Sequence, residues 1–250
     1  MDILLDTTIQ IDKILSSKKR KKVIRDCLQG KECYSSTYVL GEFYKNIVND
    51  FLTMYSIIDQ SDDLNEAERR CNEKAFARSQ SRVHKLFIDL RGLSQNNIGI
   101  MKEMIDGYID LLIEGFYTGI NRELVNGTKC KKASARIVYK EGVPVLEGIS
   151  CRATDRQCGI CEFWKSNKDA IGDLSCATNL KNKVSVLLKG IKSGKMNVKG
   201  NKCMDLGDAV VAMEAKSLMT DKAVCSSNKS DFEPICSLFG VSLISPDYRD

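Results

Sequence analysis

Hydrophobic and polar positions follow two different periodicities near the two ends of the chain. Short apolar runs that end in polar residues predict strands, and longer stretches with an apolar residue every three or four positions predict helices. The strands are expected at residues 3–5, 32–36, 223–225 and 241–244, with helices at 7–15, 18–28, 38 into the fifties, 208–219 and 232–239. This alternation is typical of an α/β fold with a mainly parallel sheet covered by helices.

The middle of the chain has a different pattern. Residues 61–125 are polar with helical apolar spacing and predict a helical pair, whereas residues 126–200 are rich in Lys, Cys and Gly and only moderately periodic. We therefore expect a core built from residues 1–60 and 201–250, interrupted by a helical, cysteine- and lysine-rich insertion over residues 61–200.

Composition limits the class of protein. Apolar residues make up 43% of the 250-residue chain, enough to bury a core, and the net charge at pH 7 is +5. No run approaches the ~20 consecutive apolar residues of a membrane-spanning helix, and the first residues carry acids where a signal peptide has basic residues. We expect a cytoplasmic protein whose eleven cysteines are thiols or metal ligands rather than a disulfide framework.

Oxygen-bearing side chains stand where predicted strands end and predicted helices begin. In an open parallel sheet, ligands bind at the carboxyl ends of the strands. Carboxylates clustered there repel each other, and a divalent cation removes that penalty. Oxygen ligands suit Mg²⁺ or Mn²⁺, which can promote hydrolysis of a phosphodiester. The candidate residues are Asp6, Glu42, Asp208 and Asn228.

Structural roles are an alternative for the same acids. Asp6 could cap the helix that follows it, and Asp208 could stabilise its helix by interacting with the positive end of the helix dipole. Asp205 shares a helical face with Asp208, and it is either a fifth acid in the site or the cap of that helix; we favour the cap. Glu42 has the weakest structural alternative, because it stands between Leu40 and Phe43 and needs a partner if it is buried.

The segments that carry these residues resemble a known family, the PIN-domain nucleases, which include the VapC-type toxin ribonucleases. The resemblance covers roughly 100 residues in two blocks. The matching segments, in family order, are "ILLDTTIQI", "SSTYVLGEFYKNI", "LGDAVVAMEAKSLMTDKAVCSSNKSDFEPI" and "GVSLISP". The resemblance implies a PIN-like α/β/α sandwich in which Asp6, Glu42 and Asp208 bind Mg²⁺ or Mn²⁺ and Asn228 supports the site.

The same resemblance implies an activity. It is that of an endoribonuclease in which a metal-activated water attacks phosphorus in line, leaving a 5′-phosphate and a 3′-hydroxyl. A toxin-like role would bring an antitoxin or another protein partner, and a homodimer is compatible with it. The chain departs from the family at Asn228, where many members have aspartate; Ser226, Ser227 and Asp231 are nearby substitutes.

Four cysteines in the middle of the chain have spacing typical of a metal site. They form C-x6-C-x2-C-x14-C and are Cys151, Cys158, Cys161 and Cys176. Four thiolates match a structural Zn²⁺ or a [4Fe-4S] cluster, and the spacing does not separate the two. Cys130 and Cys203 are further candidates should one of the four not be a ligand. The alternative is that these cysteines are small buried residues.

Lysine is the expected contact for a nucleic acid. Residues 181–202 contain seven Lys and no acid, a composition that favours binding to phosphates. RNA is preferred over DNA only by the family resemblance.

Two other functions fit parts of the sequence. Arg78 and His84 form R-x5-H, similar to the motif of the HEPN ribonucleases, which need no metal. A catalytically degenerate PIN-like module that binds RNA or serves as a scaffold, with a Cys-bound metal, is supported by Asn228. Sensitivity to EDTA separates the PIN-type ribonuclease from the HEPN-type ribonuclease, and RNA binding without cleavage would favour the scaffold.

Overall fold

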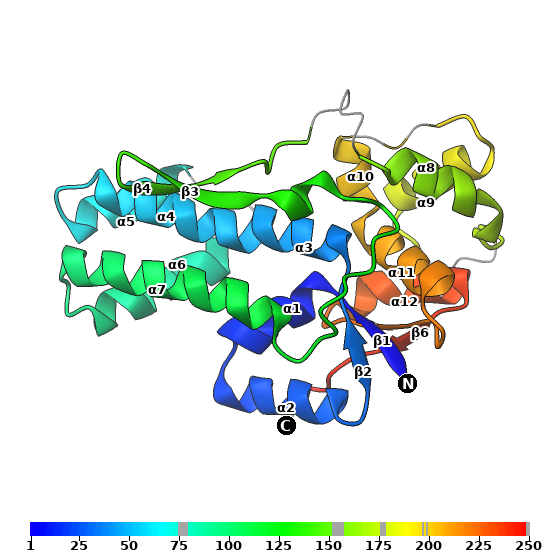
Figure 1. The fold of residues 1–250 in the computed structure, drawn as a ribbon, viewed down its shortest axis with the longest axis horizontal. Coiled ribbons are helices and arrows are strands. Elements are labelled where there is room, and N and C mark those ends of the chain that lie inside the picture. Colours follow the sequence, from blue (N-terminus) through cyan, green and yellow to red (C-terminus); the bar gives the residue numbers. More distant parts are fainter. Residues whose placement is uncertain (75–79, 152–157, 176–178, 197, 199, 249–250) are drawn as a thin grey trace.

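The computed structural model describes residues 1–74, 80–151, 158–175, 179–196, 198 and 200–248, and it contains a four-stranded parallel sheet (Figure 1). The strand order is β2-β1-β5-β6, formed by β1 (Asp2–Leu5), β2 (Glu32–Tyr34), β5 (Ala223–Cys225) and β6 (Ser242–Ile244). Leu4 of β1 is opposite Tyr34 on one side and Val224 on the other. The predicted parallel sheet is confirmed, and its strands come from both ends of the chain.

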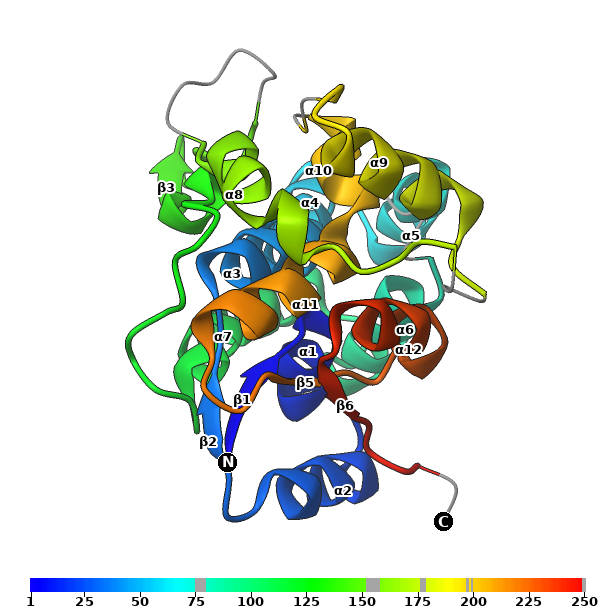
Figure 2. The same cartoon turned by 90° about the vertical axis from the view of Figure 1, so that its right-hand side faces the viewer.

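Helices lie on both faces of this sheet (Figures 1 and 2). They are α1 (Thr7–Leu15), α2 (Lys18–Leu28), α3 (Thr37–Phe43), α11 (Gly207–Leu218) and α12 (Lys229–Phe239). Ile3 and Leu5 pack in one cluster with Ile24 of α2, whereas Leu4 packs in the larger cluster with residues of α3, α11 and α12. This division follows from the alternation of side chains along a strand, and burial on both faces explains why residues 3–5 of β1 and all of β5 are apolar.

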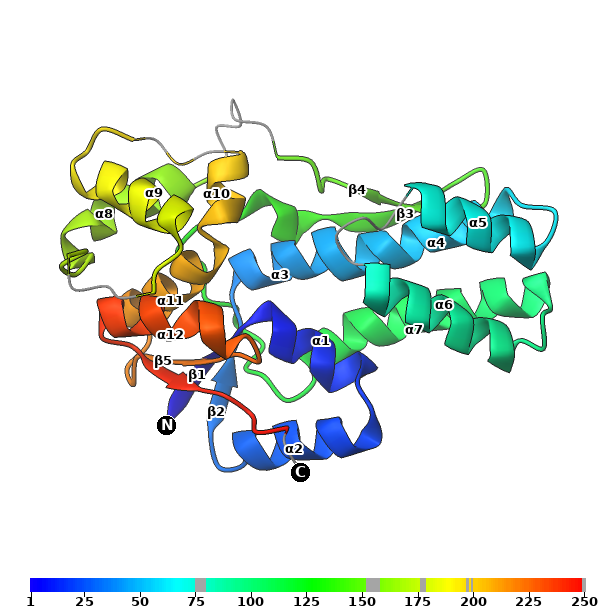
Figure 3. The same ribbon diagram turned by 180° about the vertical axis from the view of Figure 1, so that it is seen from behind.

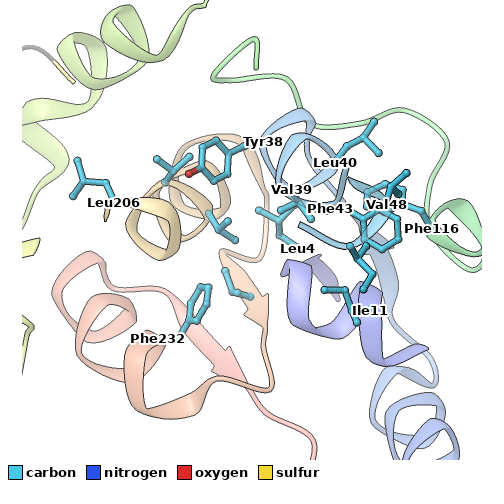
Figure 4. Packing of buried hydrophobic residues seen from close by; sticks show 14 of the residues in the cluster. Leu4, Ile11, Tyr38, Val39, Leu40, Phe43, Val48, Phe116, Leu206 and Phe232 are labelled. Carbon is cyan, nitrogen blue, oxygen red and sulfur yellow. The ribbon is translucent and has the colours of Figure 1, made fainter. Parts of the chain in front are cut away.

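The helix after β2 extends far beyond the sheet. α3 continues through a π-helical segment, η1 (Tyr44–Val48), into α4 (Asn49–Asp59), so the predicted helix from residue 38 into the fifties is confirmed. Figures 1 and 3 show α7 (Ile98–Tyr117) lying alongside this long helix, and it also contacts α1. The rings of Phe43 and Phe116 stack in a tilted arrangement with centroids 5.0 Å apart (Figure 4).

The middle of the chain contains more elements than its pattern predicts. The described residues of 61–125 form three helices rather than a pair, because α5 (Leu64–Lys74) and α6 (Gln80–Leu93) pack on each other as separate helices. Arg91 of α6 reaches Glu68 of α5 at 2.5 Å, which holds the two together. At the other end, Gln95 and Asn96 adopt positive φ, and Asn97 caps α7.

Residues 126–205 form a hairpin and several short helices. β3 (Arg136–Lys140) pairs antiparallel with β4 (Val143–Glu147). Figure 2 shows α8, α9 and α10 gathered beyond α11. The short elements are η2 (Lys131–Ser134), α8 (Ile160–Asn167), η3 (Lys168–Ala170), α9 (Asn182–Lys192) and α10 (Asn201–Asp205). Among the helices that the structure describes, none is long and apolar enough to cross a membrane.

Candidate active site

Three of the predicted acids lie at the carboxyl end of the sheet and come from three separate elements. Asp6 directly follows β1, Glu42 lies on α3, and Asp208 lies in the first turn of α11. The Thr7 hydroxyl donates to Glu42 Oε2 at 3.1 Å. Gly207 lies against the same carboxylate, since a Cβ placed there would be 3.0 Å from Glu42 Oε1. The residues next to Asp6 and Asp208 therefore both contact Glu42.

Asp6 is buried and firmly oriented by hydrogen bonds. Its Oδ2 accepts bonds from the Thr8 amide at 3.3 Å, the Thr8 hydroxyl at 2.8 Å and the Ser226 hydroxyl at 2.9 Å. Asp6 is thus the N-cap of α1, as the structural alternative expects. The bond from Ser226, which directly follows β5, ties the ends of two neighbouring strands at this carboxylate.

The electrostatics of these acids are unfavourable for charge. Burial and the repulsion from Asp6 raise the pKa of Glu42 to about 7. Burial and the repulsion from Asp6 and Glu42 raise the pKa of Asp208 to about 7. Burial also raises the pKa of Asp6, against the opposing hydrogen bonds from Thr8 and Ser226. Burial and like charges both disfavour the ionised forms, so the three groups form one interacting set.

Asn228 reaches the acidic site through a neighbour. It stands at the N-terminus of α12, and its side-chain amide donates to Asp231 Oδ2 at 2.9 Å. Lys181, just before α9, forms an ion pair with the same oxygen at 2.6 Å. Although partial burial opposes it, the bonds from Lys181 and Asn228 lower the pKa of Asp231, whose charge repels that of Asp208. Asp231 is therefore a fourth acid beside the set.

The interpretation of Asp205 as a helix cap is wrong. Asp205 is the last residue of α10, and its carboxylate forms an ion pair with Lys183 of α9 at 2.8 Å. Leu206 occupies the N-cap position of α11, and no side-chain hydrogen bond caps that described helix end. The chain breaks its helix at Leu206, so Asp205 and Asp208 belong to different helices.

Sequence reasoning missed a fifth carboxylate, Glu214 on α11. This side chain is fully buried, accepts a bond from the Thr128 amide at 3.3 Å, and is repelled by Glu42. Burial raises its pKa to about 7. The sequence feature that could have identified Glu214 is that it is the single charged residue in the apolar run of residues 209–215.

The remaining predicted site residues are only partly placed. Cys161 donates its thiol to the Val198 carbonyl oxygen at 3.3 Å, while Cys151 and Cys158 are half-buried. Cys176 and Arg78 lie outside the described residues, and of His84 only its position on α6 is described. Over the described ranges, no three or more His, Cys, Asp or Glu side chains form a group that could hold a metal ion as they stand.

Comparison with known proteins adds no relative. No family model matches the chain, and no curated protein and no solved structure matches it. The geometry of the acidic site is therefore the main observation from which a function can be proposed.

Proposed function

We propose that this protein is a PIN-type endoribonuclease that hydrolyses phosphodiester bonds with Mg²⁺ or Mn²⁺ held by Asp6, Glu42 and Asp208. The observation that carries the proposal is that three carboxylates from different elements, one buried and two half-buried, lie close together at the carboxyl end of a parallel sheet. Burial and mutual repulsion disfavour their charges, and a divalent cation bound between them offsets both effects.

The donor set suits the proposed ion. All three ligands are carboxylates, and hard oxygen donors favour Mg²⁺ or Mn²⁺ over thiophilic metals. As they stand, the described acids do not yet form a ligand set, so binding requires their side chains to rotate toward a common point. When bound, the cation supplies positive charge beside the scissile phosphate.

The surrounding residues have defined roles in this proposal. Thr8 and Ser226 orient Asp6, and Thr7 orients Glu42. Asn228 and Lys181 keep Asp231 ionised next to Asp208. Asn228 thus acts by positioning an acid, which suits a chain that lacks the aspartate common at this point of the PIN motif.

RNA is the proposed substrate. Lys181 and Lys183, from the acid-free lysine run, form ion pairs with Asp231 and Asp205 and so lie near the acidic site. Lysines near the reacting phosphate neutralise its negative charge and that of neighbouring phosphates. The preference for RNA is supported by the four motifs alone. The PIN-like sandwich is supported by the same motifs and by the helices on both faces of the sheet.

The test is cleavage of a pool of structured and single-stranded RNAs by purified wild-type protein and Asp208→Asn. We expect cleavage that requires Mn²⁺, stops in EDTA, leaves 5′-phosphates, and falls at least about 100-fold in the variant because a ligand is lost. Asp110→Asn is the matched control, since Asp110 is an exposed acid of α7 with no part in the proposed site, and its loss should leave cleavage nearly unchanged.

Two results would contradict the proposal. Cleavage that survives both EDTA and Asp208→Asn would discard the acidic site, and loss of that cleavage in His84→Ala would support a HEPN-like mechanism. Tight RNA binding without cleavage under every metal condition would favour a degenerate RNA-binding or scaffold module.

A further inference from the structure

Two cysteines that are far apart in the sequence lie against one face of α3. Cys130 precedes η2, which packs on α3, and a Cβ placed at Gly41 would lie 2.8 Å from Cys130 Sγ. One turn earlier on α3, the Tyr38 hydroxyl donates to the carbonyl oxygen of Cys203 at 3.0 Å. The segments around Cys130 and Cys203, near the two ends of the 126–200 region, therefore meet at Tyr38 and Gly41 of α3.

The chain brings two more cysteines back to the same place. The β3–β4 hairpin is a closed excursion, and Gly148 after it lies against Ala135 before it, with the Cα of Ala135 3.5 Å from a Cβ placed at Gly148. Cys151 follows three residues later. Gly159, directly after Cys158, lies against Thr128, whose carbonyl oxygen would be 2.9 Å from an added Cβ. Cys151 and Cys158 thus return beside the segment that carries Cys130.

The thiols are close enough to influence one another. Burial raises the pKa of the Cys130 thiol to about 11, with contributions from Cys158 and Cys151. Burial raises the pKa of the Cys203 thiol to about 12, with contributions from Cys130 and Cys158.

We infer that Cys130, Cys151, Cys158 and Cys203 form a four-thiolate site for one metal centre, with Zn²⁺ the expected ion. The ligand spacing is C-x20-C-x6-C-x44-C. Compared with the set expected from local spacing, this site uses Cys130 and Cys203 in place of Cys161 and Cys176. Cys161 instead donates its thiol to the carbonyl oxygen of Val198.

Metal binding at this site requires a local adjustment of side chains. The described thiols are not already arranged as a ligand set, so the four sulfurs must rotate to within about 2.3 Å of a common ion. Once formed, the centre would tie α10 to the two chain segments around the hairpin, and the first of these packs on α3 at Gly41. Because α3 carries Glu42 and α10 leads into α11 with Asp208, the centre would brace the acidic site without taking part in it.

The first experiment measures metal content by elemental analysis of protein purified under reducing conditions. We expect about one Zn²⁺ per chain in wild type, at least about a ten-fold loss in Cys130→Ser and Cys203→Ser, and full retention in the matched control Cys161→Ser. Iron with acid-labile sulfide, lost in the same two variants, would support the ligand set with a [4Fe-4S] cluster in place of zinc.

A second experiment does not depend on the folding of a variant. Metal-free wild-type protein is titrated with Co²⁺, whose visible bands report tetrahedral geometry and whose thiolate charge-transfer intensity counts sulfur ligands. One equivalent bound by four thiolates supports a four-thiolate centre, whose ligands are assigned by the variants of the first experiment. Absence of stoichiometric metal in both experiments, or metal lost in Cys161→Ser but kept in Cys130→Ser, would overturn it. No RNA is present, so the outcome is independent of the proposed nuclease activity.

Discussion

Glu42 and Asp208 are acids whose pKa values are raised to about 7 in the folded protein, from ordinary values of 4.5 and 3.8. Between a pH equal to these ordinary values and a pH of about 7, the two carboxyl groups therefore hold more protons in the folded protein than in the unfolded chain. Stability is highest below the unfolded pKa values and is lost as the pH rises through that window. We expect the Tm measured in EDTA to fall as the pH rises from about 4.5 to 7.

Two variants and one metal test this dependence. Glu42→Gln keeps an acceptor for Thr7 but cannot ionise, so the fall in Tm with rising pH should become shallower. Glu123→Gln, at an exposed position, should leave that fall unchanged. Above pH 7, Mn²⁺ should raise the Tm of wild type, because an ion that binds only the folded state stabilises it. A slope unaffected by Glu42→Gln would show that its raised pKa does not govern stability.

Sequence predicts part of this site at the level of residues. Asp6, Glu42 and Asp208 could be singled out because an acid at a strand end or helix start leaves a local signal. The bonds that orient them could not, since Ser226 is 220 residues from the Asp6 it contacts. Glu214 was missed because its partner, the Thr128 amide, is also remote, 86 residues away in the sequence.

At the scale of elements, Gly41 allows α3 to pack closely against the segment after residue 130. A Cβ there would lie 2.8 Å from Cys130 Sγ and 2.9 Å from the Lys132 Cβ. We expect Gly41→Ala to lower the free energy of unfolding by about 1–3 kcal/mol, because overpacking outweighs the gain in helix propensity. Urea denaturation measures this change.

Gly107 provides the control for Gly41. It lies on the exposed side of α7, and nothing lies within 4 Å of a Cβ added there. Gly107→Ala should therefore raise the free energy of unfolding by about 0.5–1 kcal/mol. Stabilisation by both substitutions would mean that α3 and the Cys130 segment are not closely packed in solution.

The elements near the chain ends were predictable, and those of the middle were not. Strands such as residues 223–225 are buried on both faces, so they appear as short apolar runs between turns. The β3–β4 hairpin lacks this signal, because its strands are half-exposed and its first strand, Arg136–Lys140, is charged at both ends.

At the scale of the whole molecule, the middle of the chain shares the core of the sheet region. One cluster of buried residues includes Leu4 of β1, Phe43 of α3, Phe116 of α7 and Phe232 of α12 (Figure 4). Composition changes predicted an insertion over residues 61–200. They could not predict that α7 would lie on α1 and α4. The sequence shows which face of each helix is apolar, but it does not show which other apolar face that face packs against.

Phe116→Ala tests whether this shared core unfolds as one unit. Phe116 is fully buried against Phe43, so the truncation should cost about 3–5 kcal/mol and lower the single unfolding transition of the entire protein. Leu111→Ala, at a position on the same helix that is 47% exposed, should change the transition little. Calorimetry distinguishes the alternatives, because two transitions, only one of which moves in Phe116→Ala, would make residues 61–200 a separately folding domain. A single shifted transition would mean instead that the acidic site depends on helices far from it in the sequence.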